Sequence, residues 1–261
     1  MNSTTLYTFA LLTALLIPAL AFGDTPEATT SAATPSAETP SAQAILEQVD
    51  QALTVADDFT ATIELVTTSA SGSTEERTMD VWQKGEKRMV KLTAPSRLRG
   101  VGLLAKSDDQ LYLYLPSFGR VRRVAGQQRG ESFMGSNFTQ DDIARTNFSS
   151  RFNPEYVDQN DTHWNLRLRP SDEDEPYTHL LIEVRKEDHQ VSTILFFEEG
   201  SEEAVRRLTA SDFKVIESQS LAHTVVVEEL RTKSRSVATL SDVEVNAGLS
   251  DSIFTRRYLQ R

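Results

Sequence analysis

The densest group of side chains suited to binding chemistry lies in the middle of the chain. Leucine alternates with tyrosine over one stretch, arginines follow, and a glycine-rich stretch then presents Phe and Met with few polar neighbours. From position 120 to 131 four arginines stand against one Glu, a net +3 within a chain of net charge −11. The candidate residues are the apolar Leu111, Leu113, Leu115, Phe133, Met134 and Phe138, and the cationic Arg120, Arg122, Arg123 and Arg129.

The arginines and the apolar residues predict two kinds of contact. Guanidinium groups bind a lipid phosphate or an acidic surface, so we assign the four arginines to a partner or a headgroup. Phe and Met accept apolar ligands of varied shape, so we assign the six apolar residues to a lipid site and its gate. The alternatives are ordinary sheet core for the leucines, and a surface loop whose arginines pair with carboxylates.

Other chemistries find little support. The glycine-rich stretch contains no Lys, so it is not a phosphate-cradling loop, and the acidic balance disfavours nucleic acid. The absence of cysteine excludes disulfides and thiolate metal sites. His163, His179, His189 and His223 have no partner at metal or catalytic spacing, and no Ser lies in a Gly-x-Ser-x-Gly elbow. We therefore expect neither an enzyme, a metal nor a cofactor.

Two acidic motifs have structural interpretations. Asp141 and Asp142 open a short helix predicted over 139–145, where carboxylates favour the helix dipole. Residues 172–175 read Asp-Glu-Asp-Glu and predict a solvated loop, with a weak calcium site as the alternative.

The elements that must position these residues are mostly strands. Apolar and polar residues alternate over 59–65, 79–82, 111–115, 164–168, 180–184, 191–197, 225–227 and 237–240, separated by short polar turns. About ten strands with almost no helix between them indicate an antiparallel meander. A sheet of that size must curl to protect its inner face. We predict a mainly β, strongly curved sheet or part-barrel with a helix at Ser41–Leu53 against its concave side.

The N-terminal part predicts export. Leu6 to Phe22 is apolar and uncharged and ends in Ala19-Leu20-Ala21, which predicts a signal peptide over 1–23 cleaved after Ala21 or Gly23. An uncleaved anchor is the alternative, since Met1 to Thr5 contains no basic residue. Residues 24–42 are rich in Ala, Thr, Ser and Pro and predict a disordered tether. A single domain then spans 43–261.

The central segment resembles a known family. Tyr114–Val124 followed by Gln128–Phe138 is similar to the signature of LolA-like outer-membrane lipoprotein-sorting proteins. Ala94–Gly102 and Ile253–Leu259 agree with it, so the resemblance covers roughly 44–259. It implies a periplasmic carrier, a half-open β-barrel closed by helices whose apolar interior shelters acyl chains.

The resemblance and the residues together predict a monomeric periplasmic carrier of lipoprotein or lipid cargo. The branch that the sequence resembles is often associated with membrane exporters of the resistance–nodulation–division type. The second hypothesis is therefore a non-lipid adaptor that docks onto such an exporter through the arginines. A third is an envelope stress sensor, since related half-barrels sense misplaced lipoprotein.

Overall fold

The computed structural model describes residues 39–54, 57–107, 110–172, 175–217 and 219–261. Pro40–Arg261 forms one compact unit, which contains every described helix and strand. The predicted signal peptide and most of the predicted tether lie outside the described residues. Among the residues that are described, no helix has the length and apolar character needed to cross a membrane.

Helix α1 (Ala42–Leu53) forms where the apolar spacing predicts it. Ser41 caps its first turn by accepting a hydrogen bond from the backbone N–H of Ala44 at 3.1 Å. The apolar residues at spacings of three and four put Ile45, Leu46 and Val49 on one face, and all three are completely buried.

Thirteen antiparallel strands make one sheet. They are β1 (Asp58–Thr68), β2 (Thr74–Lys84), β3 (Lys87–Ala94), β4 (Gly102–Ala105), β5 (Leu111–Leu115), β6 (Arg120–Val124), β7 (Phe152–Gln159), β8 (His163–Pro170), β9 (His179–Arg185), β10 (Val191–Phe197), β11 (Arg206–Ile216), β12 (Gln219–Glu229) and β13 (Ser234–Val245). Their order in the sheet is β6-β5-β4-β3-β2-β1-β13-β12-β11-β10-β9-β8-β7.

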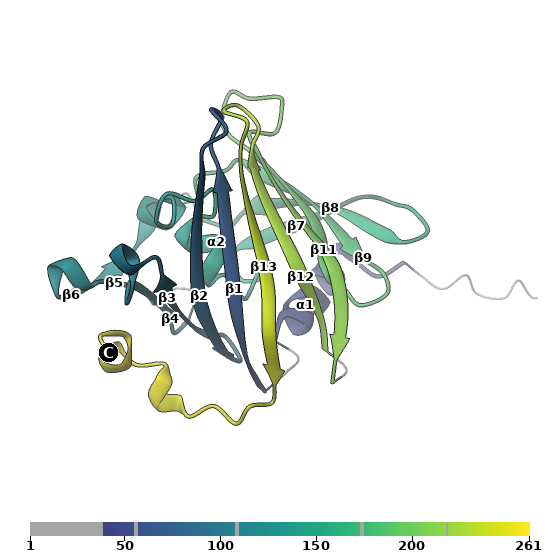
Figure 1. The fold of residues 1–261 in the computed structure, drawn as a ribbon. Coiled ribbons are helices and arrows are strands. Elements are labelled where there is room, and N and C mark those ends of the chain that lie inside the picture. The colour runs from purple at the N-terminus through teal and green to yellow at the C-terminus, as the bar shows by residue number, and fades with distance from the viewer. Residues whose placement is uncertain (1–38, 55–56, 108–109, 173–174, 218) are drawn as a thin grey trace, which may run out of the picture. The chain divides into compact units, whose positions relative to one another are not determined.

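The first and last strands meet in the middle of this sheet. β1 pairs with β13, so one meander runs outward from β1 to β6 and the other runs from β7 back to β13. The sheet curves around α1 (Figure 1), and β6 and β7 are its two edges. Residues 125–151, here called the crossing segment, therefore connect one edge of the sheet to the other. They contain the short helix α2 (Gln140–Ala144).

Three groups of buried side chains hold the layers together. On the concave face, β1–β6 pack against the crossing segment through residues such as Leu113, Phe133 and Phe138. At the other end of that face, α1 packs against β7–β10. On the convex side, Phe254 and Leu259 pack against Met89 and Leu104. The C-terminal helix α3 (Arg256–Leu259) thereby covers the outside of β3 and β4.

The predicted fold class is confirmed: the protein is mainly β, with one large antiparallel sheet that curves without closing. The structure adds strands that periodicity missed. β4 is buried at all four positions, and β11 exposes many polar residues, so neither strand alternates clearly. Pro116–Phe118 is a 3-10 turn, and Gly119 ends it in the left-handed region with φ 60°.

Candidate functional site

An apolar cavity of about 280 Å³ lies on the concave face of the sheet. Its walls come from both meanders, from the last turn of α1 and from the crossing segment. Only six of the 28 lining residues are polar, and four of them bind backbone carbonyls at the ends of the helices: Gln83, Arg88, Gln190 and Gln219. Representative wall residues are Phe59, Ile63, Met79, Ile194, Leu208, Ala210, Phe213, Val225 and Leu240.

Helix α2 covers part of this cavity. A capping box fixes its start: the backbone N–H of Asp142 donates to Thr139 Oγ1 at 3.0 Å, and the N–H of Thr139 donates to Asp142 Oδ2 at 2.7 Å. The next residue, Ile143, lines the cavity and packs on the first core group. A helix of five residues has little stability of its own, so its position depends on contacts from the surrounding chain.

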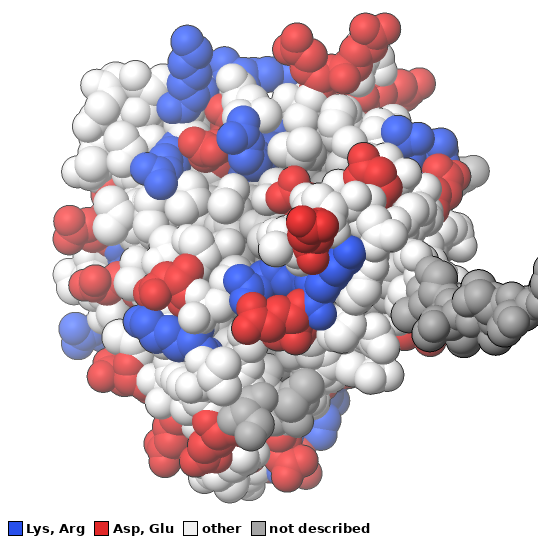
Figure 2. Space-filling view, turned by 90° about the vertical axis from the view of Figure 1, so that its right-hand side faces the viewer, with Lys and Arg blue, Asp and Glu red and all other residues white. Residues whose placement is uncertain are grey.

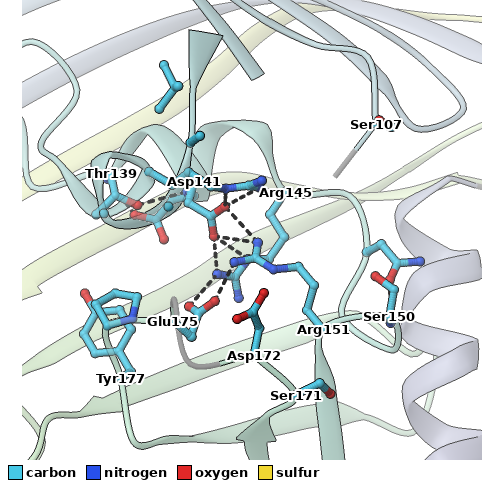
Figure 3. A pocket seen from close by; sticks show the side chains of 18 of the residues that line it. Ser107, Thr139, Asp141, Arg145, Ser150, Arg151, Ser171, Asp172, Glu175 and Tyr177 are labelled. Carbon is cyan, nitrogen blue, oxygen red and sulfur yellow. Dashed lines mark hydrogen bonds and ion pairs between the residues drawn. The ribbon is translucent and has the colours of Figure 1, made fainter. Parts of the chain in front are cut away.

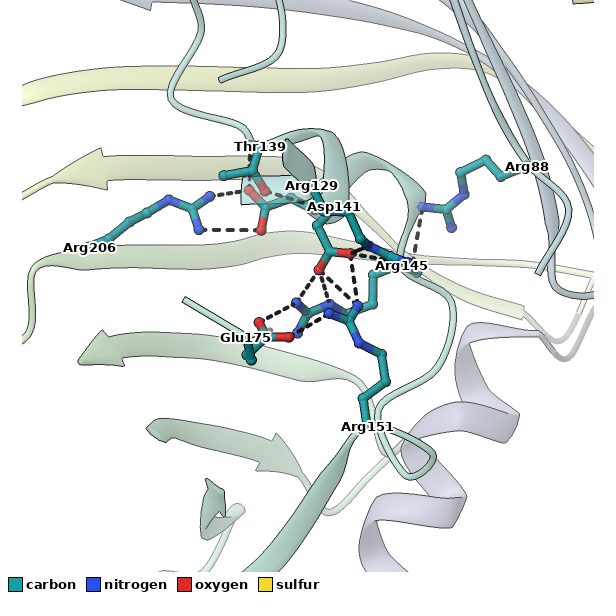
Figure 4. A network of polar contacts seen from close by, with 9 residues as sticks. Arg88, Arg129, Thr139, Asp141, Arg145, Arg151, Glu175 and Arg206 are labelled. Atoms are coloured by element: carbon teal, nitrogen blue, oxygen red, sulfur yellow. Dashed lines mark hydrogen bonds and ion pairs between the residues drawn. The ribbon is translucent and has the colours of Figure 1, made fainter. Parts of the chain in front are cut away.

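Three arginines converge on the buried carboxylate of Asp141 (Figure 4). Arg129 Nε donates to Oδ1 at 2.8 Å, Arg151 Nη1 donates to the same atom at 2.8 Å, and Arg145 binds Oδ2. Burial alone would raise the pKa of the carboxyl, but the surrounding guanidinium groups outweigh it and hold that pKa below its ordinary value. Glu175 completes the network by pairing with Arg145 and Arg151.

Further hydrogen bonds join α2 to both meanders. Asp142 binds Arg206 of β11, whose side chain is 2% exposed. Arg88 of β3 donates to the carbonyl oxygen of Ile143 at 2.9 Å. Burial lowers the pKa of Arg88 to about 10, so it is still a cation at neutral pH.

One chain of hydrogen bonds spans the cavity from α1 to α2. Gln83, which is paired with Arg88 across β2 and β3, accepts from Arg88 Nε at 2.9 Å. The same glutamine donates from Nε2 to the carbonyl oxygen of Leu53 at 2.8 Å. Gln190 and Gln219 both donate to the carbonyl oxygen of Ala52. Side chains from the sheet therefore satisfy the last carbonyls of α1, which have no partner inside the helix.

A second, polar cavity of about 600 Å³ lies on the other side of α2 (Figure 3). Asp141, Arg145, Arg151 and Glu175 point toward one another at its centre. Most of the acidic and basic side chains at the centre of this cavity thus form ion pairs with one another. The cavity is part of the support for α2, and its charges do not favour one sign of ligand.

The predicted apolar residues lie mainly in the first core group. Leu111 and Leu113 are 0% and 1% exposed, and Leu115 packs against the same group. Phe133 is 0% exposed and Met134 packs on that group, whereas Phe138 also lines the apolar cavity. The structure thus brings all six together where the crossing segment packs on the sheet, and one of them, Phe138, reaches the cavity.

The predicted arginines separate into two environments. Arg120, Arg122 and Arg123 are exposed on the edge strand β6. The register pairs Arg120 with Leu115 and Arg122 with Leu113, which places these two on the concave side and Arg123 on the other. Arg129 is 16% exposed and lies in the network around Asp141.

Several functional residues could not be found from the sequence. The residues of β10–β13 that line the cavity show the same apolar alternation as any other strand. Gln83 and Arg88 have the sequence pattern of exposed residues in a hairpin. The solvated loop predicted for 172–175 is wrong for Glu175, whose side chain is 6% exposed. His223 lies buried inside β12. Within the described ranges, no group of three His, Asp or Glu side chains is placed to hold a metal ion.

Comparisons with known proteins agree with this architecture. A family model whose description is "uncharacterized protein" matches residues 84–261. The search of curated proteins finds no match. An outer membrane lipoprotein-sorting protein domain from Vibrio parahaemolyticus is similar at TM-score 0.74 and 22% identity, covering 84% of this chain and 98% of that one.

Two further solved structures have the same fold. A DUF1329 family protein from Desulfovibrio piger is 20% identical at TM-score 0.74, covering 85% of this chain and 100% of the other. A LolA superfamily protein from Nitrosomonas europaea is 24% identical at TM-score 0.69, covering 84% and 100%. The chain therefore belongs to the family whose model matches residues 84–261, and its open, curved sheet has the fold of the LolA superfamily.

Proposed function

We propose that the protein is an exported, non-enzymatic carrier that binds acyl chains of lipoproteins or lipids in the apolar cavity. It would work as a monomer in the periplasm, taking cargo to or from the outer membrane. The observation that carries the proposal is the cavity itself, an apolar hollow on the concave face of an unclosed sheet. The names of the structural relatives, one a lipoprotein-sorting domain, support the same class of cargo.

The chemistry of the wall suits an acyl chain. Each methylene moved from water to an apolar site contributes about 0.8 kcal/mol. The volume of about 280 Å³ is near the lower end of ligand pockets, so a longer chain requires the cavity to widen. Widening by movement of α2 would break few apolar contacts, because α2 is short and is held mostly by polar side chains.

The hydrogen bonds of Arg88 supply a means of opening. They connect β3 to the end of α2, and through Gln83 to the end of α1. When these bonds break, α2 loses its attachment to Arg88 of β3, and α1 loses its attachment to the neighbouring Gln83 of β2. We expect cargo to enter and leave through this movement of α2. Where the predicted gate residues Phe133, Met134 and Phe138 move with it, their packing on the first core group is lost as well.

A cavity-filling substitution tests the carrier function. Ala210 lines the cavity, so Ala210→Phe should fill part of it and weaken binding of a fluorescent fatty acid at least about tenfold, the equivalent of two methylenes. Ala70→Phe, in the exposed turn between β1 and β2, is the matched control and should bind the probe like the parent. Equal binding by all three proteins would contradict the assignment of the cavity.

The exposed arginines support a second candidate, docking onto a membrane exporter of the resistance–nodulation–division type. Arg120, Arg122 and Arg123 project from an edge strand, while Arg129 faces Asp141. Charge reversal at the first three should abolish capture of such a partner and leave probe binding intact. Equal loss of both would show that docking and cargo binding are not separate.

A further inference from the structure

The charges of the chain are divided very unevenly along the sheet. Residues 87–130 contain ten Lys and Arg and only two acidic residues, Asp108 and Asp109, a net charge of +8. The rest of the chain therefore carries −19. This basic stretch makes β3–β6, one end of the sheet. On the side of β8 and β9, by contrast, acidic and basic side chains are interspersed (Figure 2).

Two neighbouring turns at the basic end carry arginines and an exposed aromatic ring. The turn between β3 and β4 carries Arg97 and Arg99, and the turn between β5 and β6 carries Phe118. These turns touch, because a Cβ on Gly100 would lie 3.3 Å from Pro116 Cγ. Phe118 is 71% exposed, an unusual state for a phenylalanine. We call Arg97, Arg99, Phe118, Arg120 and Arg122 the basic tip.

The basic tip keeps an excess of positive charge after its ion pairs are counted. Arg97 lies 3.4 Å from Glu75, and Arg122 lies 3.9 Å from Glu131. Both pairs are about half exposed and therefore weak. Among the described residues, Arg120 has no ion-pair partner. Two glutamates thus face four arginines, and a field of one sign extends from this end of the sheet.

The convex side of the same strands adds further cations beside aromatic rings. Arg256 lies over the ring of Tyr112 at 5.5 Å, and Lys91 lies over the ring of Tyr258 at 5.8 Å. Arg123 is paired with Tyr112 across β5 and β6, so it belongs to this side. Aromatic rings with Lys and Arg beside them are typical of surfaces at a membrane–water interface.

We propose that the basic tip docks the protein on a bilayer surface that contains anionic phospholipids. The Phe118 ring would enter the interfacial region while the surrounding arginines bind phosphates. A single protruding ring among arginines fits a soft, uniformly negative surface, because the ring does not need a shaped receptor pocket. The proposal extends the carrier function by naming the surface that the carrier approaches, and it can fail or succeed independently of cargo binding.

Sedimentation with vesicles tests the proposal on the full chain. The protein should sediment with vesicles of phosphatidylcholine and phosphatidylglycerol, less so at high salt, and much less with phosphatidylcholine alone. Arg120→Glu with Arg122→Glu should weaken binding at least about tenfold, since each basic residue near such a surface contributes about 1 kcal/mol. Phe118→Ala should weaken binding at both salt concentrations.

Matched controls separate the tip from general effects. Val215→Ala removes an equally exposed apolar side chain on the hairpin of β11 and β12, and Arg207→Glu reverses an exposed charge outside the tip. Both should bind vesicles like the parent, and all variants should keep the parent's melting temperature and fatty-acid binding.

Absence of vesicle binding, or undiminished binding by the tip variants, would overturn the proposal. Capture of an acidic protein through the tip without any vesicle binding would also overturn it. Vesicle binding by a parent protein that binds no fatty acid would refute the carrier function and leave the docking surface standing.

Discussion

Asp141 ties the crossing segment together, because arginines from three parts of that segment meet at its carboxylate. Arg129 precedes α2, Arg145 ends it, and Arg151 leads into β7. A carboxylate that loses its solvent is stable only when it is well paired. In the sequence these charged residues look like an ordinary exposed cluster. In the structure they form a buried network that holds α2 over the apolar cavity.

The first prediction concerns Asp141→Asn. Removing one partner of a buried ion pair costs about 3–5 kcal/mol, so the variant should unfold at a clearly lower urea concentration at pH 7. The pKa of Asp141 in the folded state lies below its unfolded value of 3.8. The carboxylate's contribution is therefore complete above about pH 5 and is lost as the pH falls through 3.8 toward the lower folded-state pKa.

Urea unfolding of parent and variant at equal pH measures this difference. The difference in the free energy of unfolding between parent and variant should be constant from pH 7 to about pH 5 and should decrease toward pH 3. Glu187→Gln, at an exposed pair with Arg185, is the control and should cost less than about 1 kcal/mol. A difference that does not change with pH would mean that ionised Asp141 is not what holds the segment.

At the scale of elements, the two helices on the concave face owe their positions to side chains from the sheet. Arg88 and Gln83 bind the carbonyl ends of both helices, and no apolar periodicity in α2 would have placed it there. The same strands hold α3 on the outside by close packing. The opening that we propose for the cavity would therefore require only a few hydrogen bonds to break, those of Arg88 and Gln83.

The second prediction concerns Arg88→Met, which keeps much of the side-chain volume and removes the guanidinium group. Hydrogen bonds to charged groups contribute about 1.5–3 kcal/mol, so residues 140–144 should exchange their amide hydrogens faster. Arg88→Lys, which keeps the charge but not the paired geometry, should give a smaller increase. Faster exchange spread evenly over all strands would indicate general destabilisation and contradict a local attachment.

The third prediction concerns the packing of α3 against β4. A Cβ on Gly102 would lie 2.6 Å from Leu259 Cδ1, so Gly102→Ala should displace the C-terminal helix and cost about 1–3 kcal/mol. Trp82 packs edge-on against Tyr258 of α3, and its fluorescence reports the displacement. Gly130→Ala, whose Cβ would meet only an ordinary contact, is the control.

A double-mutant cycle identifies the cause of this cost. Adding Leu259→Ala to Gly102→Ala should cost less than the two separate changes together, because the smaller side chain removes the clash. Purely additive free energies of unfolding would show that the alanine at position 102 acts through something other than α3.

At the scale of the whole molecule, the sequence predicted the fold class better than the site. Alternation such as Leu111 to Leu115 indicates strands, and Ser41 with its apolar spacing indicates α1. The cavity depends on pairing between β1 and β13, which are almost the length of the domain apart. Residues such as Ile63 and Leu240 become neighbours only through that pairing, so local patterns could not identify them.

The central segment illustrates the same limit. Its arginines stood out by charge, but one type of residue serves two purposes: Arg129 pairs inside with Asp141, while Arg120 projects outward. Which arginine does which depends on where the crossing segment turns between the two edges of the sheet. Charge counting finds the segment, and only the three-dimensional path separates its roles.

The proposed carrier function requires the cavity to hold an acyl chain. The most direct measurement is native mass spectrometry of the full chain purified from membrane-containing cells, with organic extraction of the bound material. We expect an adduct whose extract contains acyl-bearing lipid or lipoprotein, with much less on Ala210→Phe. A parent protein that carries no lipid and binds no added fluorescent fatty acid would contradict it.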